Sequence, residues 1–265
     1  MSYIHNILST MLRATAALAA ILAAHPAFLL QTQAQIIIDD FGEPASSPFQ
    51  QLIVGIGAGE AELTYTGSAG HILGATRTIA ISEMVGSGYK EASAIVRGPS
   101  YPSFTFNNDF GLNSLCLLQY DGGTDGVLDP EGLGGIFLGS ISSGRFRFEF
   151  SKDNPSVSLT LRLYTDADHA SAAVVSWGAG AVVEPVEVEL AFAAFAPIGS
   201  AGGVDFGRVG VIELLITGDA GLDFGLDNLV VVPEPSWSMG LAAFGMLAWA
   251  GGRRARRGPW GGGIG

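Results

Sequence analysis

An acidic loop over residues 120–132 carries the side chains best suited to chemistry in this chain. Its carboxylates are Asp121, Asp125, Asp129 and Glu131, on a backbone rich in glycine. Carboxylate oxygens are the ligands that calcium prefers. The spacing is not that of an EF-hand, because Gly132 stands at the twelfth position, where a bidentate glutamate is needed. The loop is therefore either a calcium site or an acidic hairpin loop kept soluble by its charge.

Patterns typical of catalysis are weak. His71 and His169 have no histidine or cysteine neighbour at metal-ligand spacing, which argues against zinc. The stretch 139–144 does not place its glycines as a nucleophile elbow does, and Glu60 replaces the third glycine of a dinucleotide fingerprint. We therefore expect no catalytic residue and no enzyme activity. A secreted polysaccharide hydrolase is the third-ranked alternative, because a catalytic carboxylate pair is defined only in space.

Aromatic residues are needed for sugar stacking. Trp177, at an expected strand end, is the first candidate, although such a residue more often lies at the edge of a core. Further candidates are Tyr65, Tyr89, Tyr101, Tyr120 and Tyr164.

Alternation of apolar and polar residues dominates the elements that must position these side chains. Residues 145–150, 158–165 and 186–192 each read as a strand with one wet face. Other β-like runs are 36–41, 51–57, 61–66, 75–84, 92–97, 113–120, 135–139, 171–177, 209–217 and 222–232. With turn residues between them, they predict an all-β fold, a two-sheet antiparallel sandwich of jelly-roll type. A parallel β-helix is the alternative, but no fixed repeat period supports it.

The net charge indicates which partners the chain can bind, and the cysteine count indicates whether it can form a disulfide. The formal net charge is -12, which disfavours binding to phosphate backbones, so we expect no nucleic-acid partner. The single cysteine, Cys116, cannot form an intrachain disulfide and stands among leucines, where we expect a packed thiol.

Both ends of the chain resemble targeting segments. Residues 1–34 have one strong charge, Arg13, before an alanine- and leucine-rich stretch, the layout of a signal peptide. Near the other end, a Pro-Glu-Pro turn precedes an apolar run from Trp237 to Gly252 and an arginine group. That run would span roughly 24 Å as a helix, short of a hydrocarbon core of about 30 Å. An anchor helix that stays in place is the alternative to a temporary hold on the membrane.

This three-part order resembles the PEP-CTERM sorting signal of Gram-negative bacteria. The residues that carry the resemblance are Pro233, Glu234, Pro235, Arg253, Arg254, Arg256 and Arg257. The resemblance implies processing by the membrane enzyme exosortase, a transient hold in the inner membrane, and transfer of the body to the cell surface or the extracellular polysaccharide. The glycine-rich tail 258–265 departs from the family, in which the arginines usually lie closer to the end.

The ends of the body, 36–41 and 222–231, resemble the first and last strands of galactose-binding-like jelly rolls, including carbohydrate-binding modules. In many of those domains a structural calcium lies near the terminal strands. Here the matching oxygen ligands are Asp39, Asp40, Asp227 and Asn228. We prefer this set to the 120–132 loop, because an ion there would join both ends of the sandwich.

These observations predict four segments: a signal peptide at 1–34, a β-sandwich domain at 35–232, a sorting signal at 233–257 and the tail at 258–265. The function expected is that of an exported, non-enzymatic sandwich sorted to the envelope or the extracellular polysaccharide matrix. The first alternative is a carbohydrate-binding module.

Overall fold

The computed structural model describes residues 35–43, 50–98, 102–142 and 144–233. Residues Ala34–Pro233 form one compact unit, to which all the described residues belong. The expected signal peptide, the residues of the sorting signal after Pro233 and the tail lie outside the described residues. Among the helices that are described, none is long and apolar enough to cross a membrane.

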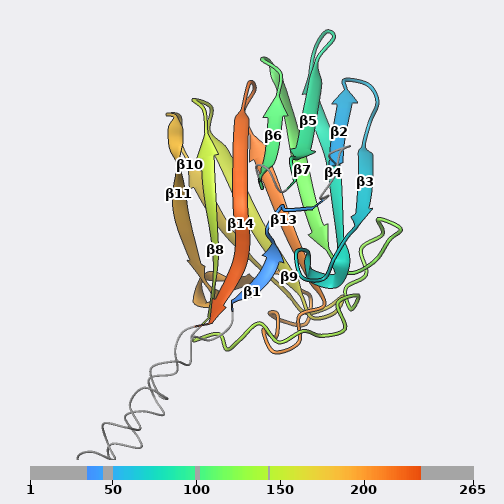
Figure 1. Cartoon of the computed structure of the whole chain (residues 1–265), viewed down its shortest axis with the longest axis vertical. Helices are drawn as coiled ribbons and strands as arrows, with labels where there is room; N and C mark the ends of the chain where they lie inside the picture. Colours follow the sequence, from blue (N-terminus) through green and yellow to red (C-terminus); the bar gives the residue numbers. More distant parts are fainter. Residues whose placement is uncertain (1–34, 44–49, 99–101, 143, 234–265) are drawn as a thin grey trace, which may run out of the picture. The chain divides into compact units, whose positions relative to one another are not determined.

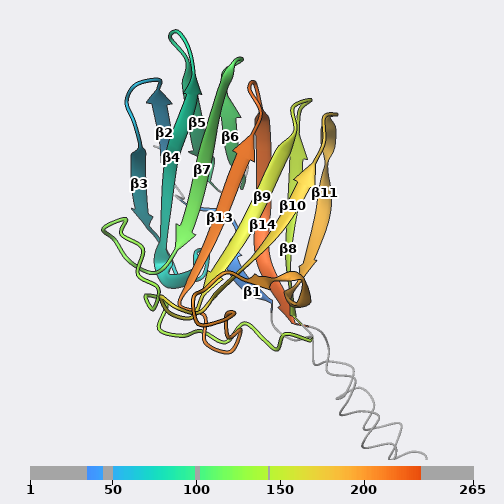
Figure 2. The same ribbon diagram turned by 180° about the vertical axis from the view of Figure 1, so that it is seen from behind.

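The unit is a sandwich of two seven-stranded sheets, seen from its two sides in Figures 1 and 2. The first sheet has the strand order β11-β8-β14-β6-β5-β2, and β1 pairs separately with β14. Its strands are β1 (Ile36–Asp39), β2 (Gln50–Gly55), β5 (Glu91–Val96), β6 (Phe104–Asn108), β8 (Gly144–Lys152), β11 (Val182–Ala191) and β14 (Asp223–Pro233). We call it sheet A.

The second sheet, sheet B, has the order β12-β10-β9-β13-β7-β4-β3. Its strands are β3 (Ala61–Thr66), β4 (Thr76–Gly86), β7 (Leu112–Tyr120), β9 (Val157–Tyr164), β10 (Ala170–Trp177), β12 (Ala196–Pro197) and β13 (Val211–Gly218). Two 3-10 turns, η1 (Leu73–Ala75) and η2 (Phe192–Ala194), complete the regular structure of the described residues. Every strand pair is antiparallel, which confirms the all-β, two-sheet prediction.

The alternating apolar residues of the strands form the core, because every second side chain of a strand points to the same face. In β8, Phe146, Phe148 and Phe150 are buried, while the charged residues between them face outward. In β9 of the other sheet the buried set is Val157, Leu159, Leu161 and Leu163. Because side chains point to opposite faces in turn, each sheet gives one apolar layer to a shared core. Cys116 lies in that core as a buried free thiol, and burial raises its pKa well above its ordinary value.

One strand prediction was wrong, and two strands were missed, β6 and the two-residue β12. The run 135–139 forms only an isolated bridge between Ile136 and Val209, within the long connection from β7 to β8. Conversely, β6 (Phe104–Asn108) was missed, although Phe104 and Phe106 are buried on alternate positions. The short apolar run 135–139 is flanked by glycines, and the backbone there bonds to the connection after β12 rather than to a strand. Tertiary contacts overrode the local pattern.

The two ends of the unit lie side by side. Ile36 of β1 pairs with Val231 of β14, and Pro233 pairs with Gly144. The turns that join β4 to β5, β6 to β7, β8 to β9, β10 to β11 and β13 to β14 lie at the opposite end, the upper end in Figure 1. We call this the distal end, because it points away from both chain termini of the unit.

Candidate functional site

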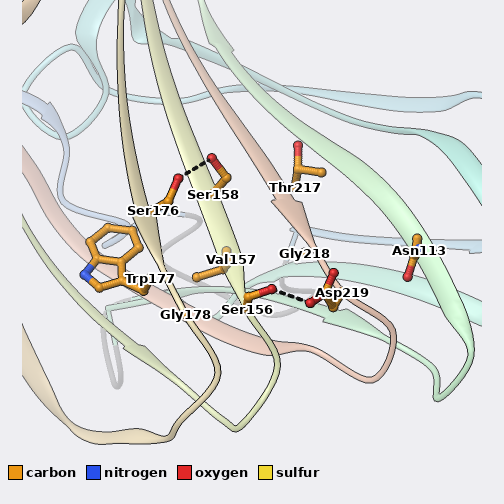
Figure 3. A pocket seen from close by; sticks show the side chains of 10 residues that line it. All are labelled: Asn113, Ser156, Val157, Ser158, Ser176, Trp177, Gly178, Thr217, Gly218 and Asp219. Carbon is orange, nitrogen blue, oxygen red and sulfur yellow. Dashed lines mark hydrogen bonds between the residues drawn. The ribbon is translucent and has the colours of Figure 1, made fainter.

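A shallow cleft lies at the distal end of sheet B, shown in Figure 3. Its volume is about 410 Å³. Strand register places Thr217 of β13, Ser158 of β9 and Ser176 of β10 in one row across the outer face. The remaining lining residues are Asn113, Ser156, Val157, Trp177, Gly178, Gly218 and Asp219.

The sequence builds this row from the period of the strands. In each of β9, β10 and β13, hydroxyl residues take outward positions near the distal end while their neighbours face the core. The Ser158 and Ser176 hydroxyl oxygens lie 3.0 Å apart, and the Ser156 hydroxyl donates to Asp219. At Gly218 the side chain of Leu222 fills the space where a Cβ would stand, so a larger residue beside Asp219 would have to displace the buried Leu222.

The cleft is chemically suited to a hydroxyl-rich, neutral ligand. Hydroxyls and an amide can both donate and accept hydrogen bonds, and Val157 and Trp177 add apolar surface. Among the described residues that line the cleft, Asp219 is the acidic one and none is cationic. Sequence reasoning missed Asn113, Ser158, Ser176, Thr217 and Asp219. A signal was present, because hydroxyl residues occupy outward positions at three strand ends, but only the fold shows that the strands are neighbours.

Trp177 borders the cleft but is largely a core-edge residue. Its ring centroid lies 4.0 Å from that of Phe150, with the planes tilted by 35°, so one face of the indole is covered. Sugar stacking by Trp177 stays a prediction, and the part of the ring that lines the cleft is the surface a ligand would reach.

The tyrosine candidates divide by environment. Tyr120 is buried, and Tyr65 is partly buried beside the Arg77 guanidinium. Tyr164 donates to Glu213 at 2.9 Å, and burial raises its pKa to about 12. Tyr101 lies outside the described residues. Tyr89, by contrast, is fully exposed in the turn between β4 and β5.

The acidic loop is organised by hydrogen bonds to its own backbone. Asp121 is buried and accepts from the amides of Gly123 and Asp129 and from the Gln119 side chain, at 2.9, 3.2 and 2.7 Å. Asp125 accepts from Val127 at 3.2 Å, and Asp129 accepts from Glu131 at 3.0 Å. These are turn-forming bonds, the role of acidic residues in an ordinary hairpin loop.

The terminal-strand set is divided between the core and the outer surface. Asp39 points into the core and pairs with Arg77, whereas Asp40 faces outward, with its Oδ2 2.6 Å from Nδ1 of His71. Asp227 lies on the outer face of sheet A, and Asn228 beside it is exposed with a positive φ. Asp40 follows the end of β1, and its charge adds to the rise in the pKa of Asp227, so these two carboxylates lie near each other while Asp39 is held by Arg77 in the core.

The described residues hold no group of three or more His, Cys, Asp or Glu side chains that could bind a metal ion. Neither calcium expectation therefore gains support from the geometry. Asp227 instead faces Glu149 across the β14 and β8 pair. Burial raises the pKa of Asp227 to about 6, and the Glu149 charge adds to this shift.

No protein-family model and no curated protein sequence matches the chain. Among solved structures, it is similar to a family 11 carbohydrate-binding module from Clostridium thermocellum in complex with a β-1,3-1,4-mixed-linked tetrasaccharide. The identity is 10% and the TM-score 0.35, over 76% of this chain and 96% of that chain. It is also similar to the family 30 carbohydrate-binding module of the cellulosomal cellulase Cel9D-Cel44B of Clostridium thermocellum, at 12% identity and a TM-score of 0.36, over 69% of this chain and 98% of that chain.

A third similar structure is the enzymatically active domain of tailspike protein 4 of bacteriophage CBA120. Its identity is 9% and its TM-score 0.32, over 71% of this chain and 19% of that chain. Similarities of this size assign neither a ligand nor a site to this chain.

Proposed function

We propose that this chain is an exported, non-enzymatic β-sandwich that holds neutral polysaccharide in its distal cleft, at the cell surface or in the extracellular matrix. The cleft is the observation that carries the proposal. Its row of hydroxyls from Thr217, Ser158 and Ser176 offers donors and acceptors to sugar hydroxyls.

The position of the cleft supports the same role. The cleft lies at the end of the sandwich opposite to Ile36 and Pro233, where the chain continues into the expected targeting segments. A body held by its terminal end would present the cleft to its surroundings. The net charge of -12 and the Asp219 carboxylate favour neutral over anionic glycans.

Affinity electrophoresis of the mature protein, purified from the cells that export it, tests this proposal. The probes are mixed-linked β-glucan, mannan, the polysaccharide shed by the producing cells, and alginate as an anionic control. We expect at least one neutral probe to retard the protein and alginate to leave its mobility unchanged. If none of the neutral probes retards it, the proposed function is wrong.

Variants locate the binding. Thr217→Val keeps the shape of the side chain and removes its hydroxyl, so we expect a loss of affinity of about twofold to twelvefold, from about 0.5–1.5 kcal/mol per hydrogen bond. Thr160→Val is the matched control, because Thr160 lies on the same outer face of β9, two residues from Ser158 and outside the cleft lining. Equal losses in both variants would place the ligand elsewhere.

The sorting step is a separate part of the proposal, supported by the terminal residue pattern alone. Exosortase would act near Pro235 after the apolar run has held the chain in the inner membrane. The mature protein should then lack the residues after about Pro235, and intact-mass measurement of the exported protein reads this directly. Arginines 253–257 still attached in protein outside the cell would instead favour a retained anchor or an unprocessed chain.

A further inference from the structure

Two aromatic rings stand fully in solvent at the distal end. Tyr89 lies in the turn between β4 and β5, and Phe110 lies in the turn between β6 and β7. Their exposed fractions are 109% and 87%. Exposure of this degree has a cost in water, because each ring keeps its apolar surface hydrated. A role in the core is excluded for both.

Hydrogen bonds fix the two turns to each other. The Nζ of Lys90 donates to the Phe110 carbonyl oxygen at 2.5 Å, and the Glu91 amide donates to Asp109 Oδ2 at 2.9 Å. The Asp109 amide returns a bond to the Glu91 carbonyl at 3.1 Å. These bonds extend the β5 and β6 pairing beyond Ala92 and Asn108, so the two rings sit on one rigid support rather than on independent loops.

The turn that carries Phe110 also contacts the turn that borders the cleft. The Gly221 amide donates to the Asp109 carbonyl at 3.2 Å, and a Cβ at Gly221 would lie 3.6 Å from Phe110. Gly221 belongs to the turn between β13 and β14, which also carries Asp219 of the cleft lining. The ring of Phe110 lies on one side of this turn and the hydroxyl row of the cleft on the other, so one extended ligand could contact both.

The area of the patch formed by Tyr89 and Phe110 indicates what kind of ligand it can bind. Two aromatic side chains bury about 150–250 Å² each, so the pair offers about 300–500 Å². A stable protein partner or a second copy of this chain needs about 800 Å² on each side. The patch matches ligands made of small rings. The carboxylates Asp109 and Glu91 outnumber the Lys90 ammonium beside Phe110, so the local net charge opposes phosphate-bearing ligands.

We infer that Tyr89 and Phe110 form an aromatic platform that stacks on pyranose rings and extends the glycan site of the cleft over the distal turns. This inference rests on the proposed function. A pyranose presents C–H groups on one face and hydroxyls at its edge, so a flat ring beside a hydroxyl-lined cleft contacts both parts of one chain. The ligand is thus a neutral polysaccharide of several sugar units, longer than the cleft alone would hold.

Affinity electrophoresis of the full exported protein tests the platform with the neutral probe that binds it best. We expect Phe110→Ala and Tyr89→Ala each to weaken binding about threefold to tenfold, the range for one aromatic contact. Phe110→Leu should lose nearly as much as Phe110→Ala, because it stays apolar but has no flat face. Phe137→Ala is the matched control, since Phe137 is 69% exposed in the connection between β7 and β8.

The outcomes separate the two proposals. If Thr217→Val weakens the retardation by the neutral probe but Phe110→Ala and Tyr89→Ala do not, the platform is wrong and the cleft remains the binding site. Failure of the original protein to bind any neutral probe would overturn both. A Phe110→Leu variant that binds as tightly as the original protein would show that the turn offers apolar contact without stacking, which also overturns the platform. Unchanged thermal unfolding of the alanine variants excludes loss of the fold as the cause.

Discussion

The Nη1 of Arg77 lies 2.5 Å from Oδ2 of Asp39, and both side chains are completely buried between the two sheets. Asp39 ends β1, and Arg77 belongs to β4 of sheet B. The same carboxylate accepts from the Tyr120 hydroxyl at 3.0 Å, and the guanidinium also donates to Gln50 and to the Glu43 carbonyl. The cation that joins the first strand to the opposite sheet is thus a side chain of the protein itself.

Removal of this cation should be costly. In Arg77→Met the buried Asp39 carboxylate loses its ion pair, and loss of one partner of a buried pair costs about 3–5 kcal/mol. We expect the free energy of unfolding, measured by urea denaturation, to fall by this amount. Arg208→Met, at an exposed arginine, is the control and should change it by less than about 0.5 kcal/mol. Equal stability of the two variants would show that the ion pair contributes nothing.

Calcium should have little effect on stability. The Asp39 charge is already matched by Arg77, and the loop carboxylates are engaged in turns. An ion that bound the folded form would add about 2.7 kcal/mol at a hundredfold excess over its dissociation constant. We expect thermal melts with millimolar calcium and with a chelator to coincide. If calcium raises the melting temperature and Asp227→Ala abolishes this rise, calcium binds at the terminal strands. If Asp125→Ala abolishes it instead, calcium binds at the 120–132 loop.

Replacement of Asp227 should stabilise the protein at neutral pH. Because the folded-state pKa is raised from 3.8 to about 6, the carboxyl's contribution to stability is complete below about pH 3.8 and is lost as the pH rises through about 6. Asp227→Asn removes that loss. We expect a gain of roughly 1 kcal/mol at pH 7, after allowance for solvent screening of this half-buried group, and none at pH 3.5.

Urea denaturation at the two pH values measures this difference, with Glu184→Gln on exposed β11 as the control. If Asp227→Asn has the same effect at both pH values, ionisation of the half-buried Asp227 carboxyl is not its cause.

His71 should titrate above its ordinary value. Its hydrogen bond to Asp40 raises the pKa from 6.5, since the carboxylate favours the charged ring. Asp40→Asn should return the pKa toward 6.5, as followed by NMR of the imidazole protons across pH 5 to 9. A titration curve that is the same with and without the Asp40 charge would contradict the contact.

The sequence by itself determined the fold class and the core. Strict alternation in runs such as 145–150 leaves one solution, a strand with its phenylalanines buried, because the period of a strand sends successive side chains to opposite faces. The sequence misled at 135–139 and at β6. Each segment has five residues, too few to tell a strand from a loop by pattern, so long-range pairing decides.

The residues of the candidate site could be identified only from the tertiary structure. Asp39 reads in the sequence as a surface ligand, but its partner Arg77 is distant along the chain and meets it only when β1 lies across from β4. Likewise Ser158, Ser176 and Thr217 are ordinary outward residues until strand order places them in one row. Local pattern fixes which face a side chain takes, whereas neighbours across a sheet or between sheets depend on topology, which no local period encodes.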